Sequence, residues 1–409
     1  MSDAEGGDAE VAPMDGADDP QGLDRVFCHL PWVHLCAHVD GVYARCCVDA
    51  SAQQNWPQYQ GSRPERLVLR EDALGCMPGS PFAADNPDRV MDIGAAFNSP
   101  ALRATRLAML AGRPVPACRD CYQRERLAGD SLRLQMLRQG KRVPSVTECR
   151  DRTAPDGSVD GFPYYLDLRL GNHCNLRCVM CDVPTSSLLV RHHPDTWLPG
   201  SLDPYSTDPD FWRALEDNLW AIRSLYLAGG EPLLLRAHQR LLRLFVDRGR
   251  APEVDLTYAT NLTVLPRGVM DLWRQFRAVS LEASCDGVGP VFERVRLGGR
   301  WADFTRNVER VRDEVTVSIH ASPQRDNVMD LGNIIDWALS QGLPVHVSNT
   351  VREPAELSIR NLPPEVKQQA LGYLVPLTQR LDADGYANVA RDVRGVTGYL
   401  MAPRTLAGT

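Results

Sequence analysis

The sequence predicts an α/β fold with a parallel sheet that is either open or closed into a partial barrel. From about residue 162 onward, short apolar runs typical of buried strands alternate with amphipathic stretches of helical period. Strands that alternate with helices form parallel sheets, because each helix returns the chain to the same edge. Hydrophobic residues make up 44% of the chain and charged residues 24%, which is an ordinary globular composition. A sizeable core is therefore expected.

The individual elements follow from this alternation. Strands are expected at 164–170, 224–228, 254–259, 278–284, 315–320 and 345–349. Helices between them are expected at 210–222, 238–248, 302–313 and 331–341.

The 409 residues suggest two domains with flanking segments. Residues 1–22, rich in Gly, Ala, Pro and Asp without hydrophobic period, are expected to be a disordered acidic tail. Residues 23–154 form a Cys-containing module with helices at 99–111 and 121–139, and the linker PDGSVDG follows at 155–161. The alternating segment occupies 162–352, and 353–409 is a C-terminal helical extension.

Charge and cysteine usage narrow the class of protein. The formal net charge is -7, and Lys and Arg are scattered, so nucleic acid is not an expected partner. The N-terminus lacks the pattern of a signal peptide, and no apolar run approaches eighteen residues, so we expect a cytoplasmic protein without membrane contact. Disulfides seldom persist in that compartment, so paired spacings among the 12 cysteines favour metal ligands.

The most specific motif is the loop after the first strand of the alternating segment. Cys174, Cys178 and Cys181 stand at the spacing C-x3-C-x2-C. Three thiolates bind three irons of a cubane and leave the fourth iron open to a small molecule. The alternatives are a zinc site and three buried thiols, but zinc requires a fourth ligand, and His173 lies too close to Cys174 to be an easy one.

This motif resembles the cluster loop of the radical S-adenosylmethionine (SAM) superfamily. The resemblance implies a partial (β/α)6 TIM-like barrel, a 4Fe-4S cluster with an open iron, and SAM cleavage to a 5′-deoxyadenosyl radical. It covers residues 162–352, and the insertion 188–209 is a departure that either covers the site or is a surface loop.

Three strand ends are expected to bind SAM. Gly229, Gly230, Glu231 and Pro232 follow the second strand, where two glycines let the backbone approach a ligand closely. The resemblance places the ribose and methionine parts of SAM at the next two strand ends, which carry Thr260, Asn261, Ser284 and Asp286. The carboxyl ends of parallel strands are also where α/β proteins bind ligands. Cys285, between two residues that face the cofactor, is expected to point away and pack.

The N-terminal module carries a second cysteine pattern, formed by Cys28, Cys46, Cys118 and Cys121. It resembles the twitch module, the shortened SPASM domain, in which a hairpin cysteine pair and a later C-x-x-C pair hold an auxiliary 4Fe-4S cluster. Gly41 is expected to turn the hairpin. In most relatives this module follows the barrel, whereas here it precedes it. A zinc knuckle built from the same thiolates is the alternative. Four cysteines lie outside both patterns and are expected to be buried thiols rather than a third cluster: Cys36, Cys47, Cys76 and Cys149.

Substrate contacts are expected from inward residues of the later strands, with barrel-interior packing as the alternative. The candidates are Thr316, Ser318, His320, His346, Ser348 and Asn349. Arg294 and Arg296 are either grips for an anionic group or surface charges.

The leading functional hypothesis is an oxidoreductase. The deoxyadenosyl radical would abstract hydrogen from a substrate carbon, and the auxiliary cluster would accept an electron, as in dehydrogenation of an alcohol, aminocyclitol or sugar-like natural-product intermediate. Sugar or peptide epimerisation, maturation (crosslinking) of a peptide, and a non-enzymatic metal-binding scaffold are the alternatives. The chain has no Gly-x-Gly-x-x-Gly dinucleotide motif, so a flavodoxin or ferredoxin is the expected reductant.

Overall fold

The computed structural model describes residues 25–50, 56–59, 61, 63–138, 143–193, 196–198, 202–347 and 349–402. The acidic tail predicted at 1–22 and the candidate Ser348 lie outside these ranges.

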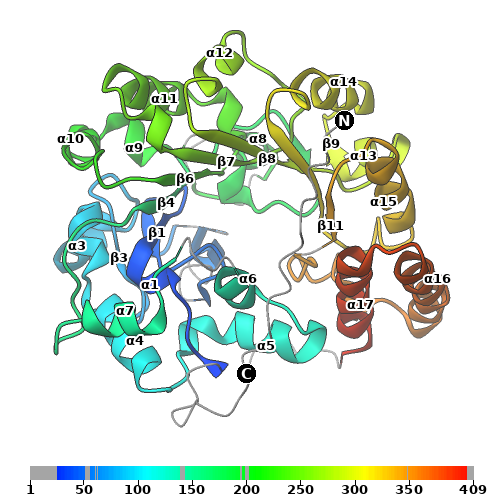
Figure 1. The fold of residues 1–409 in the computed structure, drawn as a ribbon, viewed down its shortest axis with the longest axis horizontal. Helices are drawn as coiled ribbons and strands as arrows, with labels where there is room; N and C mark the ends of the chain where they lie inside the picture. The colour runs from blue at the N-terminus through cyan, green and yellow to red at the C-terminus, as the bar shows by residue number, and fades with distance from the viewer. Residues whose placement is uncertain are drawn as a thin grey trace, which may run out of the picture.

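A nine-stranded sheet organises the described residues, in the order β11-β10-β8-β7-β6-β4-β1-β2-β3. From β11 to β1 every neighbouring pair is parallel, and the strands curve around a common interior (Figure 1). The six predicted strands are present as β4 (Tyr165–Leu168), β6 (Ser224–Leu227), β7 (Asp255–Thr260), β8 (Ala278–Ser284), β10 (Thr316–Ala321) and β11 (Val345–Val347). The predicted α/β class with a partial parallel barrel is confirmed.

A seventh parallel strand comes from the N-terminal segment. β1 (His34–Ala37) pairs in parallel with β4, so the barrel sheet includes a strand from before the linker predicted at 155–161. The chain then turns at Gly41, whose φ of +76° lies in the left-handed region that favours glycine. It returns as β2 (Val42–Ala44), antiparallel to β1, and β3 (Gly75–Cys76) pairs with β2. The hairpin predicted around Gly41 is thus present.

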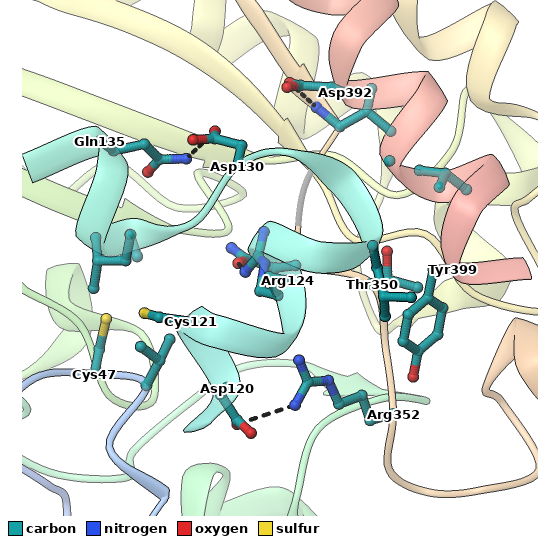
Figure 2. Close-up of a pocket in the computed structure, with 18 of the residues that line it drawn as sticks. Cys47, Asp120, Cys121, Arg124, Asp130, Gln135, Thr350, Arg352, Asp392 and Tyr399 are labelled. Atoms are coloured by element: carbon teal, nitrogen blue, oxygen red, sulfur yellow. Dashed lines mark hydrogen bonds and ion pairs between the residues drawn. The ribbon is translucent and has the colours of Figure 1, made fainter. Parts of the chain in front are cut away.

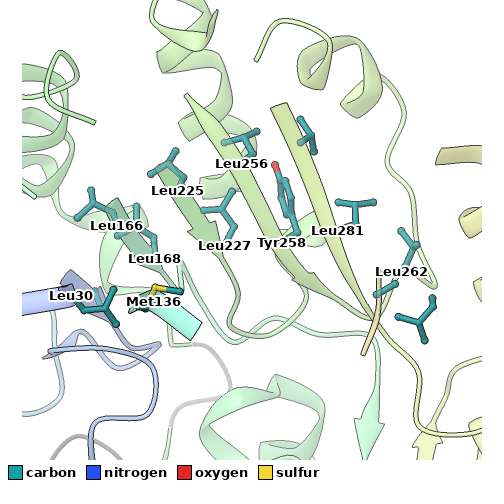
Figure 3. Packing of buried hydrophobic residues seen from close by; sticks show 14 of the residues in the cluster. Leu30, Met136, Leu166, Leu168, Leu225, Leu227, Leu256, Tyr258, Leu262 and Leu281 are labelled. Carbon is teal, nitrogen blue, oxygen red and sulfur yellow. The ribbon is translucent and has the colours of Figure 1, made fainter. Parts of the chain in front are cut away.

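Alternation along the strands separates two environments. Leucines and Tyr258 on the outer faces of β4, β6, β7 and β8 pack under the helices, as Figure 3 shows. Polar residues project from the opposite face into the barrel interior, including Asp167, Tyr226 and Glu282. A polar barrel interior is suited to hold a polar ligand.

Helices cover the outer face of the sheet (Figure 1). The four predicted helices appear as α10 (Pro209–Asp217), α11 (Arg236–Asp247), α14 (Trp301–Val311) and α15 (Leu331–Ser340). Shorter helices lie among them: α8 (Ser187–His192), α9 (Pro204–Thr207), α12 (Val269–Trp273) and α13 (Pro290–Val295). Within the described residues, no helix is long and apolar enough to cross a membrane.

The N-terminal segment adds α1 (Leu30–Val33), α3 (Ile93–Phe97), α4 (Pro100–Leu110) and α7 (Val146–Asp151). The single helix predicted at 121–139 is wrong: α5 (Arg119–Ala128) and α6 (Leu132–Arg138) are separate. Gly129, with φ of +68°, caps α5 in the left-handed conformation and ends it.

The C-terminal extension closes the remaining side of the barrel. It comprises α16 (Pro364–Ala383) and α17 (Ala387–Met401), and α17 contacts both α5 and β11 (Figure 1). The described part of the insertion 188–209 packs on the N-terminal segment, where Trp197 donates a hydrogen bond to the Gln58 carbonyl (2.9 Å). The insertion therefore fastens two segments of the chain together.

Candidate active site

The three-cysteine loop leaves the carboxyl end of β4 and is held by a small ladder of its own. β5 (Arg177–Cys178) pairs antiparallel with β9 (Arg296–Leu297), so that Cys178 lies opposite Arg296. Cys174 accepts a hydrogen bond from the Leu176 amide at 3.4 Å. The backbone thus fixes the first two cysteines of the motif.

The three thiols of this loop lie close enough to influence each other's ionisation. Burial raises the pKa of Cys174 to about 12, and the neighbouring Cys178 adds to the rise. The pKa of Cys178 is lowered by a hydrogen bond from Cys181, whose own pKa is raised by that bond. A bound cation favours thiolates in such a group.

The Gly229-Gly230 pair is required by close backbone contact with this loop. A Cβ atom on Gly229 would lie 2.6 Å from the Gly171 carbonyl oxygen, and one on Gly230 would lie 2.4 Å from that of His173. The Glu231 amide donates to the same His173 carbonyl at 2.9 Å. The glycine motif is therefore seated directly against the cysteine loop.

Glu231 joins two of the predicted strand ends. Its carboxylate accepts hydrogen bonds from the Thr260 hydroxyl (2.7 Å), the Asn261 amide (2.8 Å) and the Leu233 amide (3.1 Å). Burial raises the pKa of Glu231 to about 7, although these three bonds oppose the rise. The Asn261 side chain lies 3.9 Å from the Cys174 sulfur, so this strand end also reaches the loop. Pro232 begins the short 3-10 helix Pro232–Leu234 that follows.

The third strand end, after β8, is linked to the cysteine loop by an ion pair. Asp286 is buried and pairs with Arg296 at 2.6 Å, and the Arg296 guanidinium lies 3.8 Å from the Cys178 sulfur. Arg296 is therefore not a surface charge, whereas Arg294 donates a weak 3.5 Å hydrogen bond at the exposed surface. Ser284 is half-buried toward the interior, and Cys285 packs in the core, with its thiol 3.3 Å from the Gly287 carbonyl oxygen.

The four cysteines of the N-terminal pattern converge. Cys118 interacts electrostatically with Cys28 and Cys121, and Cys46 interacts with Cys118 and Cys121. Burial is the main cause of their raised pKa values, and each neighbouring thiol adds to the rise. The hairpin and α5 thus deliver thiols from distant parts of the sequence to one place.

The remaining cysteines divide into two groups. Cys76 and Cys149 are buried in separate apolar clusters. Cys36 and Cys47 lie close to Asp167 of the barrel interior. Cys47, which the sequence predicts to be a buried thiol, lines a cavity.

A cavity of about 460 Å³ lies in the barrel interior, and Cys174, Cys178 and Cys181 are not among the residues that line it. Cys47 and Cys121 line it on the N-terminal side, and Ala228, Gly229 and Ala259 line it where β6 and β7 end. Figure 2 shows the polar side chains that α5, the residues after β11, and α17 contribute. They include the Asp120–Arg352 ion pair (3.0 Å).

The predicted substrate residues are only partly placed at this cavity. Asn349 lines it, and its side-chain oxygen accepts a 3.1 Å hydrogen bond from Arg124. Ser318, His320 and His346 instead contact one another: Ser318 and His320 lie 3.0 Å apart, and the two imidazole rings are 4.8 Å apart. Burial and the adjacent His346 lower the pKa of His320 to about 3, so its imidazole is neutral. Thr316 is exposed at the start of β10.

Sequence reasoning missed most of the charged cavity wall. Arg124 and Asp120 sit on α5, Asp392 on α17, and Arg169 follows β4. Alternation along β4 and β6 would have indicated Arg169 and Tyr226 as interior residues. No sequence pattern placed α17 beside α5, because that contact joins segments about 270 residues apart.

The thiols fit iron–sulfur clusters by their chemistry. Both sets are soft thiolate donors, and a cubane takes each thiolate at its own iron. Among the described residues, no three His, Cys, Asp or Glu side chains are placed to hold a single metal ion.

Comparison with known proteins agrees with this arrangement. The family model described as the Radical SAM superfamily matches residues 168–338, the segment that contains the cysteine loop and the strand ends around it. Residues 168–338 are therefore similar in sequence to radical SAM domains.

Several solved structures are similar. A structure titled native anSMEcpe with bound AdoMet has 16% identity and a TM-score of 0.40, covering 54% of this chain and 62% of its own. Streptococcus suis SuiB bound to S-adenosylmethionine has 13% identity and a TM-score of 0.38, covering 70% of this chain and 62% of its own. The chain thus spans 62% of the length of each. A comparison with curated protein sequences found no match.

Proposed function

We propose that the chain is a radical SAM oxidoreductase that dehydrogenates an alcohol carbon of a polar small molecule, such as an aminocyclitol or a sugar-like intermediate. The observation that carries this proposal is a cavity lined both by Cys121 of the N-terminal set and by Gly229, which packs against the base of the three-cysteine loop. A substrate in it would contact the strand ends around one set and Cys121 of the other.

The chain's own residues would hold the cofactors as follows. Cys174, Cys178 and Cys181 would bind three irons of the first cluster, and Arg296, beside Cys178, would hold the carboxylate of SAM. The close packing of Gly229 and Gly230 on the cysteine loop would bring their backbone groups to the methionine amine. Cys28, Cys46, Cys118 and Cys121 would bind the auxiliary cluster.

When bound, SAM and the first cluster supply a hydrogen-atom acceptor, and the auxiliary cluster supplies a one-electron acceptor. The residues around the cavity orient the substrate between them and limit contact with water. An auxiliary cluster with four thiolates has no open iron for substrate, so electron transfer is the role that its ligand set favours.

The polarity of the cavity supports a polar substrate. Carboxylates and guanidinium groups from four parts of the chain line it: Asp120, Asp130, Asp392, Arg124, Arg169, Arg352 and Arg391. Hydroxyl and amino groups of an aminocyclitol are suited to hydrogen-bond with both kinds of side chain. A flavodoxin or ferredoxin would supply the electron for SAM cleavage.

The direct test is anaerobic incubation of the reconstituted enzyme with SAM, dithionite and a panel of deuterated aminocyclitols and amino sugars. We expect deuterium transfer to 5′-deoxyadenosine together with a product two electrons more oxidised than the substrate. Formation of 5′-deoxyadenosine without any oxidised product, from every panel member that supports it, would refute the proposal.

Epimerisation is the second candidate, and Cys47 favours it, because a thiol that lines the cavity is placed to return a hydrogen atom to a substrate carbon. Incorporation of solvent deuterium into a product at the substrate's oxidation level would identify this reaction. A Cys47→Ser variant would then lose that incorporation, whereas a dehydrogenase would keep its oxidised product in the same variant.

A further inference from the structure

Tyr226 and Glu282 form a hydrogen-bonded pair across the barrel interior that neither cofactor site uses. The Tyr226 hydroxyl donates to Glu282 Oε2 at 2.7 Å, from β6 to β8. β7 lies between these strands, and it presents Ala259 opposite Glu282. The small side chain of Ala259 leaves room for the Tyr226 ring to cross β7.

The pair faces the cavity from one end only. Tyr226 lines the cavity together with Gly229, which follows it by three residues at the predicted SAM site. Glu282 does not belong to the lining, so a cavity ligand reaches its carboxylate through the phenol oxygen. The two side chains form a hydrogen-bonded path from Tyr226 at the cavity wall to the half-buried carboxylate of Glu282.

We infer that Tyr226 and Glu282 accept the hydroxyl proton of the substrate when the alcohol carbon is oxidised. This inference rests on the proposed dehydrogenation. The substrate carbon gives its hydrogen atom to the deoxyadenosyl radical, and the substrate hydroxyl gives its proton to the Tyr226 oxygen while the Tyr226 proton passes to Glu282. The one electron that remains leaves to the auxiliary cluster, so that C–O becomes C=O.

The charge environment suits this role. Burial raises the pKa of Glu282 above its ordinary value, against the lowering effect of the Tyr226 hydrogen bond. A carboxylate shifted toward neutrality is a better proton acceptor at working pH than an ordinary one. Burial and the Glu282 charge raise the pKa of Tyr226, so the phenol stays protonated and relays rather than ionises. The groups that face Glu282 are Tyr165 and Asp167 on β4, Tyr226 on β6, Cys47 after β2, and Ser318 on β10.

The test compares the Tyr226→Phe and Glu282→Gln holoenzymes with wild type, using the panel member that gives most 5′-deoxyadenosine. Proton acceptance by a positioned group is worth about 10² to 10⁴ in rate, so oxidised product per 5′-deoxyadenosine should fall at least about tenfold in both variants. Deuterium transfer into 5′-deoxyadenosine should change by less than about threefold, because the pair acts after hydrogen abstraction. Tyr386→Phe removes a hydroxyl from an exposed tyrosine that does not line the cavity, and it should keep the wild-type ratio.

A second readout does not depend on turnover. Infrared difference spectra of the holoenzyme between acid and neutral pH should contain a protonated carboxyl band that is lost in Glu282→Gln and shifted in Tyr226→Phe. A wild-type product ratio in both variants, or a spectrum unaffected by either change, overturns the relay while the proposed dehydrogenation stands. A wild-type enzyme that makes no oxidised product overturns both.

Discussion

Replacement of Gly230 by alanine tests whether the glycine motif positions the cysteine loop. The new Cβ would lie 2.4 Å from the His173 carbonyl oxygen and 2.6 Å from the Asn172 carbonyl carbon. Both neighbours are backbone, so no side-chain rotation relieves the contact, and the loop must shift by about 1 Å to reach ordinary van der Waals separation. Overpacking of this kind costs about 1 to 3 kcal/mol.

The shift matters because His173 directly precedes Cys174. We expect the Gly230→Ala protein to fold with a lower melting temperature and to hold the first cluster poorly after reconstitution, while the auxiliary cluster is retained. Iron analysis and electron paramagnetic resonance after reduction measure the clusters, and calorimetry measures the melting temperature. Gly372→Ala in α16 is the matched control, since nothing lies within 4 Å of its added Cβ. A Gly230→Ala protein with wild-type iron content and melting temperature would refute the reasoning.

Two further predictions concern stability. Arg106 is fully buried and donates hydrogen bonds to the carbonyl oxygens of Pro31 (2.8 Å) and Phe97 (2.6 Å), among others. Arg106→Met should therefore lower the free energy of unfolding by about 3 kcal/mol or more in urea titrations, because these carbonyl groups lose their donors. A loss under about 1 kcal/mol would contradict this. Because the pKa of Glu231 is raised to about 7 in the fold, its protonated form is the one that folding favours. Its stabilising contribution is complete below its ordinary pKa near 4.5 and is lost as the pH rises through 7, a change of about 3 kcal/mol at 1.36 kcal/mol per pKa unit. Glu231→Gln should remove that pH dependence from the unfolding free energy of the chain before cluster loading, and an unchanged slope between pH 5 and 8 would count against it.

Local patterns predicted the elements of the barrel well, because each strand and helix carries its own periodicity. The strand at 278–284 has the predicted bounds, and the others agree within a few residues. The cysteine loop and the Gly229-Gly230 motif were recognisable for the same reason: their spacing along the chain is what the chemistry requires. The structure adds why two glycines stand there, which is backbone contact with Gly171 and His173.

The parts that sequence reasoning missed depend on contacts between distant segments. β1 carries only four residues and sits before the linker, so nothing local indicated that it pairs with β4. The break between α5 and α6 depends on Gly129, which ends α5, and on Ser131, whose hydroxyl accepts a hydrogen bond from the Leu134 amide at the start of α6. The helical period of the apolar residues hides both. The cavity wall from α17 required the tertiary fold, and so did the placement of Cys47 at the cavity rather than in a core.

The measurement that tests the central claim most directly is the metal content of two forms of the anaerobically reconstituted chain. We expect about eight irons and eight sulfides per wild-type chain, four for each cubane, and about four in a variant with Cys174, Cys178 and Cys181 replaced by alanine. Mössbauer spectra should show cubanes in both forms. Loss of all iron from the triple variant, or one zinc per chain that disappears with Cys28→Ser or Cys118→Ser, would contradict the account.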